Sequence, residues 1–186
     1  MKNFNRKCTL VSLCGLNCGL CPMNLGGYCP GCGGGEGNQS CEIARCSMLH
    51  GEIEFCYLCY EYPCEKYEKI HELDSFITHR NQLKDLEKIK NMGLEFYTHE
   101  IEEKIEILKY LLENCNDGRR KNFFCIAINL LELQDIKYVL EQIVSETESQ
   151  MLSQKEKAAI AVNLFQKMAM KRNIVLKLNK KACEDK

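Results

Sequence analysis

Ten cysteines in the first third of the sequence are the residues best suited to chemistry. Three C-x2-C pairs occur among them, and each pair brings two thiolates to a common point, as tetrahedral metal sites require. The sequence therefore predicts metal binding. The ten candidate ligands are Cys14, Cys18, Cys21, Cys29, Cys32, Cys41, Cys46, Cys56, Cys59 and Cys64.

The strongest submotif is the stretch from Cys29 to Gly33, which reads Cys-Pro-Gly-Cys-Gly and resembles the knuckle of rubredoxins and zinc ribbons. Proline restricts the turn, and glycine lets the backbone fold tightly enough for N–H groups to point at sulfur. A second pair, seven residues upstream, leaves enough chain to fold against this turn. We predict one closed site with the ligands Cys18, Cys21, Cys29 and Cys32.

Five further thiols follow, which is one more than a second four-ligand site needs. Cys56 and Cys59 are the safest members, and two of Cys41, Cys46 and Cys64 would complete the set. Other divisions stay open, because Cys14 could join the first site, or the ten thiols could form one four-ligand site and one binuclear six-thiolate site. His50 precedes Gly51 and is interpreted as an exposed loop residue rather than a ligand.

Closed coordination by thiolates alone favours structural zinc, with a single rubredoxin-like iron as a close chemical substitute. An iron–sulfur cluster is the alternative, because Cys14, Cys18 and Cys21 have the spacing that radical S-adenosylmethionine enzymes use. Those enzymes carry the motif in a large barrel, and the ferredoxin run of cysteines does not occur here. A disulfide framework is disfavoured, because bridges between cysteines this close would close small loops and stabilise little.

Composition divides the chain near residue 64. The first 64 residues hold 11 of the 14 cysteines, 10 of the 12 glycines and all 3 prolines. Such a segment has few large apolar side chains to bury and needs metal to hold its shape. We predict a cysteine-rich metal-binding module over residues 1–64, irregular and built on zinc-ribbon or rubredoxin-like knuckles, and an all-α helical bundle domain over residues 65–186.

The helices of the bundle are predicted from three- and four-residue spacing of apolar side chains. Gly93 should end the second helix, and Ser153 with Glu156 forms a capping box. Cys115 and Cys125 lie among apolar residues and are predicted to be buried thiols, whereas Cys183 lies in a charged tail and Cys8 has no assignment. The expected helices cover residues 65–73, 75–92, 94–115, 119–131, 135–144 and 153–172.

Charge argues against binding to nucleic acid. The first 64 residues carry four basic and five acidic side chains, and the remainder carries 21 of each. Thiolate centres add negative charge, so the module should repel phosphates. No apolar run approaches the roughly 20 residues of a membrane span. The run from Thr9 to Leu16 is interrupted by Cys14 and lacks a cleavage site, so we expect no signal peptide and a reducing cytoplasm as the location.

The cysteine pattern resembles that of an uncharacterised family from anaerobic bacteria and archaea, catalogued as domain of unknown function 3795. The resemblance rests on Cys-Gly-Leu-Asn-Cys from Cys14 to Cys18, on the later cysteine pairs, and on Tyr-Pro-Cys from Tyr62 to Cys64. It extends to the stretch from Asn114 to Leu131 and so covers most of the chain. The resemblance implies a metal-binding protein with zinc or an iron–sulfur cluster, and it implies no particular reaction.

These observations predict a metal-binding protein with about two closed four-cysteine zinc sites. Because closed ligand sets leave no position for water, we expect no hydrolytic chemistry and predict no catalytic residue. The expected role is structural or regulatory, through binding to another protein. The alternatives are an iron–sulfur protein of redox or electron-transfer type, and a metal or thiol sensor that uses the unassigned cysteines.

Overall fold

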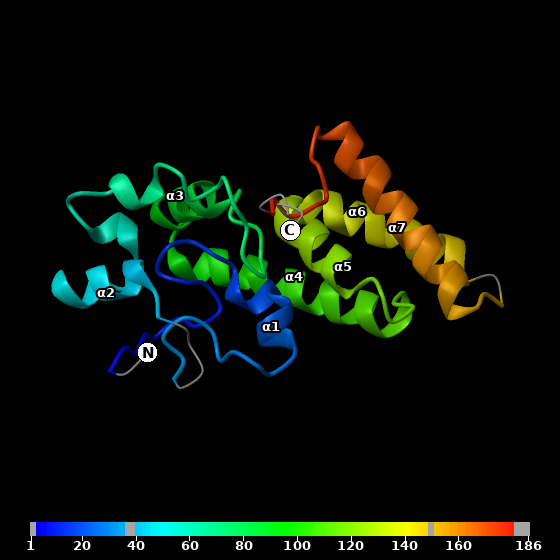
Figure 1. Ribbon diagram of the computed structural model, residues 1–186. Helices are drawn as coiled ribbons and strands as arrows, with labels where there is room; N and C mark the ends of the chain where they lie inside the picture. Colours follow the sequence, from blue (N-terminus) through cyan, green and yellow to red (C-terminus); the bar gives the residue numbers. More distant parts are fainter. Residues whose placement is uncertain (1–2, 36–39, 149–150, 181–186) are drawn as a thin grey trace, which may run out of the picture. The chain divides into compact units, whose positions relative to one another are not determined.

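The computed structural model describes residues 3–35, 40–148 and 151–180, and within these ranges it is helical and has no strand (Figure 1). The helical part of the fold prediction is therefore confirmed in coarse form. The zinc-ribbon or rubredoxin-like form of the cysteine-rich module stays a prediction. The elements are η1 (Cys18–Leu20), α1 (Pro22–Leu25), α2 (Glu42–Leu49), η2 (Cys56–Leu58), η3 (Glu65–Tyr67), α3 (Gln82–Met92), α4 (Leu94–Asn114), α5 (Lys121–Leu130), α6 (Leu133–Glu148) and α7 (Gln154–Lys171), where η marks a 3-10 helix.

The chain forms two compact units. The first unit comprises Met1–Ile101 with Leu178–Lys186, and the second comprises Glu102–Lys177. Residues 65–101, which include α3, belong to the same compact unit as the ten candidate ligands. The domain boundary predicted near residue 64, between a module over residues 1–64 and a helical domain over residues 65–186, stays a prediction.

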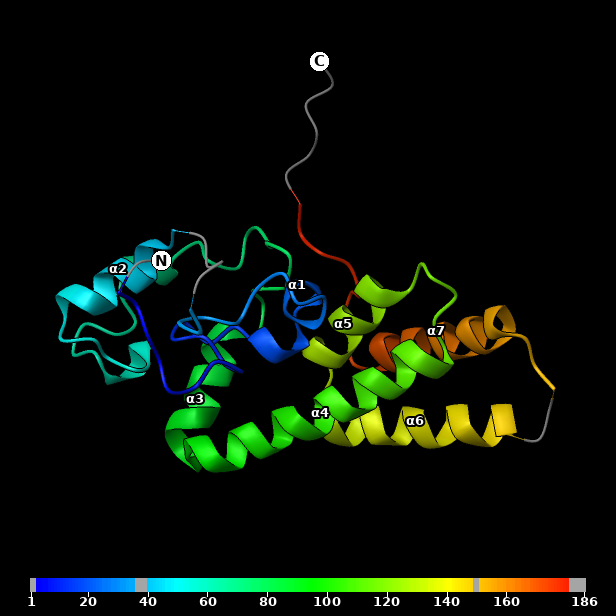
Figure 2. The same ribbon diagram turned by 90° about the horizontal axis from the view of Figure 1, so that it is seen from below.

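Aromatic packing and ion pairs, among them that of Arg172 with Asp135, connect the helices of the second unit. The rings of Phe124 in α5 and Phe165 in α7 meet edge to face, with centroids 6.1 Å apart. Helices α6 and α7 pack along one another (Figure 2). The guanidinium of Arg172 donates two hydrogen bonds to the carboxylate of Asp135, of 2.6 and 2.8 Å, which fixes the end of α7 against the start of α6.

Several helix boundaries follow the sequence prediction. Gly93 ends α3 with a φ of 90°, and the capping box of Ser153 and Glu156 begins α7. Helix α5 buries most of its residues, as its apolar composition predicts. Cys115 and Cys125 are buried, with exposed fractions of 1% and 3%, which confirms their interpretation as core thiols. The prediction for Cys183 lies outside the described residues.

The predicted helix over residues 65–73 is wrong, and so is the first part, residues 75–81, of the helix predicted over residues 75–92. Only Glu65–Tyr67 is helical there, as a 3-10 turn, and α3 begins at Gln82. The carboxylate of Asp74 accepts hydrogen bonds from the backbone N–H groups of His79 and Asn179. These bonds offer the backbone an alternative to a helix, and Asn179 lies too far along the chain for local periodicity to reveal it.

A buried polar network joins the cysteine loop to the helices of the first unit. The side-chain amide of Asn17 donates to the Asp85 carboxylate of α3 at 3.0 Å. The hydroxyl of Tyr97 in α4 donates to the Asn17 oxygen at 3.0 Å. Because Asn17 directly precedes Cys18, these bonds set the position of the first C-x2-C pair.

The core of the second unit can be tested by shortening Phe165, which has no exposed surface. Phe165→Ala should lower the free energy of unfolding by about 3–5 kcal/mol, because the change removes a buried ring and leaves a cavity. The control is Met170→Ala in the same helix, where the side chain is 69% exposed. It should change the free energy by less than about 0.5 kcal/mol. Urea unfolding followed by circular dichroism measures both, and equal effects would contradict this core.

Candidate metal centre

The cysteines of the first unit gather into two groups, identified by the thiols that act electrostatically on one another. The charge of Cys14 also acts on Cys56, which links the two groups electrostatically. The first thiol group comprises Cys14, Cys18, Cys21, Cys32 and Cys41. The second thiol group comprises Cys46, Cys56, Cys59 and Cys64.

This grouping shows which thiols act on one another, but it does not decide which of them share a metal ion. Cys41 acts on Cys14 and Cys32, so it lies with the first group, although it is close in sequence to the second. Cys29 is half-buried, and its carbonyl accepts a hydrogen bond from the side chain of Asn24. None of the 13 cysteines that the structure describes forms a disulfide bond. The ten-residue ligand set remains a prediction.

Burial dominates the acidity of the first thiol group. It raises the pKa of Cys14 to about 11 and that of Cys18 to about 12. Two polar groups contact the Cys14 sulfur, namely the Ser12 hydroxyl at 3.1 Å and the Gln82 amide nitrogen at 3.2 Å. A hydrogen bond from the backbone N–H of Cys32 lowers the pKa of Cys18 but does not offset burial.

Arg6 supplies positive charge beside the first thiol group. Its side chain is only 2% exposed, and its guanidinium donates to the backbone carbonyls of Glu54, Val11 and Cys32. Burial raises the pKa of the Cys32 thiol, whereas a hydrogen bond from the Leu13 N–H and the charge of Arg6 lower it. N–H donors and a cation directed at sulfur favour the thiolate form, which is the form that binds metal.

Two glycines allow the backbone to fold this closely around the sulfurs. Gly15 has a φ of +93°, and a Cβ there would lie 2.3 Å from the carbonyl oxygen of Gln82. Gly31, in the turn between Cys29 and Cys32, has a φ of +90°, and a Cβ would lie 2.3 Å from the carbonyl oxygen of Thr9. A side chain at either position would push the turn away from its neighbour.

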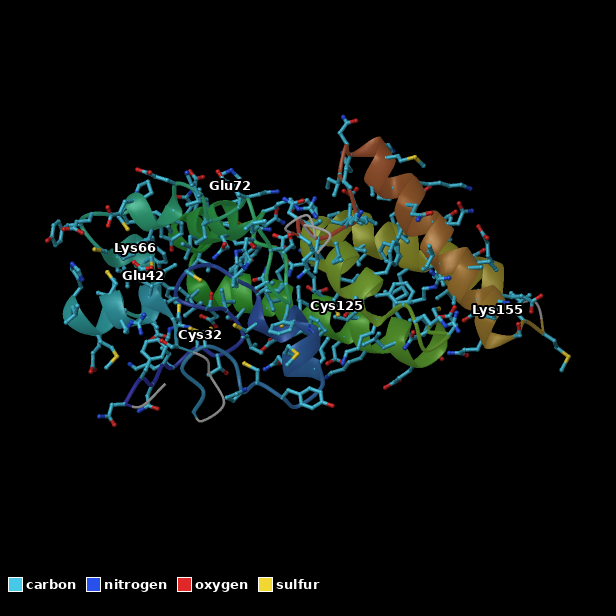
Figure 3. The ribbon with its side chains drawn as sticks, in the orientation of Figure 1. Cys32, Glu42, Lys66, Glu72, Cys125 and Lys155 are labelled. Carbon is cyan, nitrogen blue, oxygen red and sulfur yellow. The ribbon has the colours of Figure 1, made fainter. Side chains whose placement is uncertain are left out.

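The second thiol group lines a small cavity of about 30 Å³. Helix α2 supplies Cys46, the 3-10 turn η2 supplies Cys56 and then Cys59, and Cys64 precedes η3. Lys66 of η3 lies 3.8 Å from the carboxylate of Glu42 at the start of α2, and the two side chains are labelled in Figure 3. The hydrogen bond from the Ser47 hydroxyl to the Ile53 carbonyl, of 2.8 Å, joins two segments that line the cavity.

Burial raises the pKa of Cys56 to about 12, and hydrogen bonding to the Tyr67 side chain lowers it in part. The charges of Cys64 and Cys46 raise it further. Tyr67 also donates to the carbonyl of Cys14 at 3.4 Å, so one side chain contacts both thiol groups. Four thiols that face one cavity and repel one another as thiolates match the donor chemistry of a zinc or iron site, because a bound cation removes that repulsion.

One set of three metal-ligand atoms converges within the residues that the structure describes. It consists of His50, Cys59 and Glu61, whose ligand atoms all lie within 4.8 Å of one another. No set of three cysteine sulfurs in the described residues meets the same limit. His50 caps the end of α2, four residues after Cys46, and is therefore not an isolated loop residue. Sequence reasoning discounted His50 and missed Glu61, although Glu61 follows Cys59 by only two positions.

Comparison with protein-family models, with curated proteins and with solved structures gave no match. The resemblance of the cysteine pattern to the family named above stays a prediction. Among the described helices, none combines the length with the apolar composition needed to cross a membrane.

Metal binding should release protons and weaken as the pH falls. The pKa values of Cys14, Cys18 and Cys56 lie at about 11 to 12, so these thiols are protonated at neutral pH without metal. Since ligation needs thiolates, each proton released should make the apparent affinity for Zn²⁺ about tenfold weaker per pH unit lowered. Competition with a chromophoric chelator at about pH 6.5 and about pH 8.5 measures this. An affinity that does not change with pH would mean that the ligands are already ionised.

Proposed function

We propose that this chain is a metal-binding protein that holds about two thiolate-ligated metal ions in its first unit, with zinc as the metal. The observation that carries the proposal is the gathering of nine candidate cysteines into two groups of mutually interacting thiols. Buried thiols stay neutral without a counter-charge, and a cation converts such a group into a stable, charged centre.

The proposed role is structural support for an interaction with another protein. A metal with all positions filled by thiolates has no place for a substrate, which favours support over catalysis. Large apolar side chains are exposed beside the second thiol group, namely Leu49 at 85%, Leu58 at 57% and Tyr60 at 86%. Contiguous exposed apolar patches mark interaction surfaces, and we propose that these three side chains belong to one.

An iron–sulfur protein is the second candidate, and the spread of the sulfurs favours it. With Zn–S bonds of about 2.3 Å, tetrahedral geometry brings the ligand sulfurs to about 3.8 Å from one another. Three cysteine sulfurs do not converge within 4.8 Å in the described part of the chain. In an iron–sulfur cluster the thiolates bind different iron atoms and stand further apart. The chemistry would then be electron transfer.

Metal content tests the proposal. Protein purified without oxygen should be colourless and contain about two zinc ions per chain. Cys56→Ser should remove about one ion, because it deletes a sulfur of the second thiol group. The matched control is Cys125→Ser, which changes another buried thiol, in the second unit, and should leave the zinc content unchanged.

Elemental analysis, an absorption spectrum and a sulfide assay read out this experiment. Visible absorption with stoichiometric iron and acid-labile sulfide would replace zinc with the iron–sulfur candidate. Protein that binds neither zinc nor iron would overturn both.

Removal of the metal should unfold the cysteine-rich segment selectively. The free energy of metal binding is part of the folding free energy of such a module, whereas the aromatic core of the second unit has no thiolate centre. A chelator should therefore abolish the order of residues 1–64 and leave most of the helical circular dichroism signal. Thermal unfolding with and without chelator gives the comparison. An unaltered transition would count against a structural metal.

A further inference from the structure

His50, Cys59 and Glu61 form a mixed set of nitrogen, sulfur and oxygen donors. We propose that these three side chains bind a divalent cation of the zinc class at the solvent-exposed edge of the second thiol group, with one coordination position open. The inference rests on the proposed function and refines it. Cys59 binds metal together with His50 and Glu61, and it is not the fourth ligand of a four-thiolate site.

The hydrogen bonds of His50 prepare its ring for a metal. Its Nδ1 atom lies 2.9 Å from the backbone carbonyl oxygen of Cys46, so in the neutral ring the proton sits on Nδ1. The lone pair is then on Nε2, and Nε2 lies 3.9 Å from a carboxylate oxygen of Glu61. Metal-binding histidines show this arrangement, in which the second nitrogen donates to a backbone carbonyl and sets the tautomer.

A lone pair facing a carboxylate is unfavourable unless something positive lies between the two. A proton on Nε2 would supply that positive charge and give an ion pair between His50 and Glu61. This ion pair would not involve the Cys59 sulfur. A divalent cation would satisfy both groups and also the Cys59 thiolate, whose sulfur lies in the same 4.8 Å set. Imidazole, thiolate and carboxylate are all zinc ligands, whereas a softer ion prefers thiolate and a harder ion prefers carboxylate.

The surroundings support the three donors. Hydrogen bonding between the Tyr60 hydroxyl and the Glu61 carboxylate orients the latter, and the Tyr60 ring lies 6.3 Å from that of His50. The side chains of His50 and Glu61 are 28% and 50% exposed, so an ion can reach them from solvent. Since zinc is commonly tetrahedral, three ligands leave a fourth position for water or an incoming ligand. Such a site can exchange its metal, which a closed thiolate site resists.

The histidine rings report the site directly. In the full-length chain with one added equivalent of Zn²⁺, long-range proton–nitrogen spectra should show a shifted Nε2 resonance for His50. His71, His79 and His99 serve as internal controls and should not respond.

Variants separate the metal site from the ion pair. Glu61→Gln should weaken the affinity for this ion by about tenfold or more, because it removes a charged ligand. The control Glu68→Gln changes an exposed carboxylate outside the set and should have no effect. If the Nε2 resonance of His50 does not shift while zinc analysis finds bound metal, this inference fails and the proposed function stands. If the Nε2 resonance of His50 shifts but the chain holds only this one ion, the proposed function of about two thiolate-ligated ions fails instead.

Discussion

The burial of thiols is the constraint on which the first unit depends. Neutral thiols are compatible with an apolar interior, and burial raises the pKa values of Cys14, Cys18 and Cys56 accordingly. Thiolates at the same places would need positive charge nearby. Arg6 provides one such charge and is itself buried, with carbonyl oxygens around its guanidinium. Several thiolates need more than one arginine, and this is the physical reason for proposing metal ions.

The two thiol groups are built as one assembly. Helix α2 has Cys41 of the first group at its start and Cys46 of the second group in its body. The backbone N–H of Cys56 donates to the carbonyl of Leu13, next to Cys14, and Tyr67 contacts both groups. Any ion that orders one group therefore also positions the other, and under the proposed function the two ions stabilise one folded segment.

The second unit is held by different forces. Its core contains the edge-to-face pair of Phe124 and Phe165, and the Arg172 guanidinium binds Asp135 through two hydrogen bonds. Its buried thiols contribute packing, with Cys125 in α5 and Cys115 directly after the end of α4. Ordinary apolar burial accounts for this unit, so the chain combines a conventional helical core with a segment whose sulfur chemistry is its main feature.

The sequence by itself determined the helices of the second unit, the end of α3 at Gly93 and the capping box at Ser153, because these depend on neighbours within one or two turns. It also located the ten candidate ligands. Only the tertiary structure decided which thiols share a group, since Cys41 lies with Cys14 and Cys32 although the chain places it near Cys46. Tertiary contacts likewise replaced the predicted helix after Asp74 with bonds to Asn179, and brought His50 to Cys59 and Glu61. Residue spacing along a chain determines local order, whereas the convergence of side chains depends on how separate segments fold together.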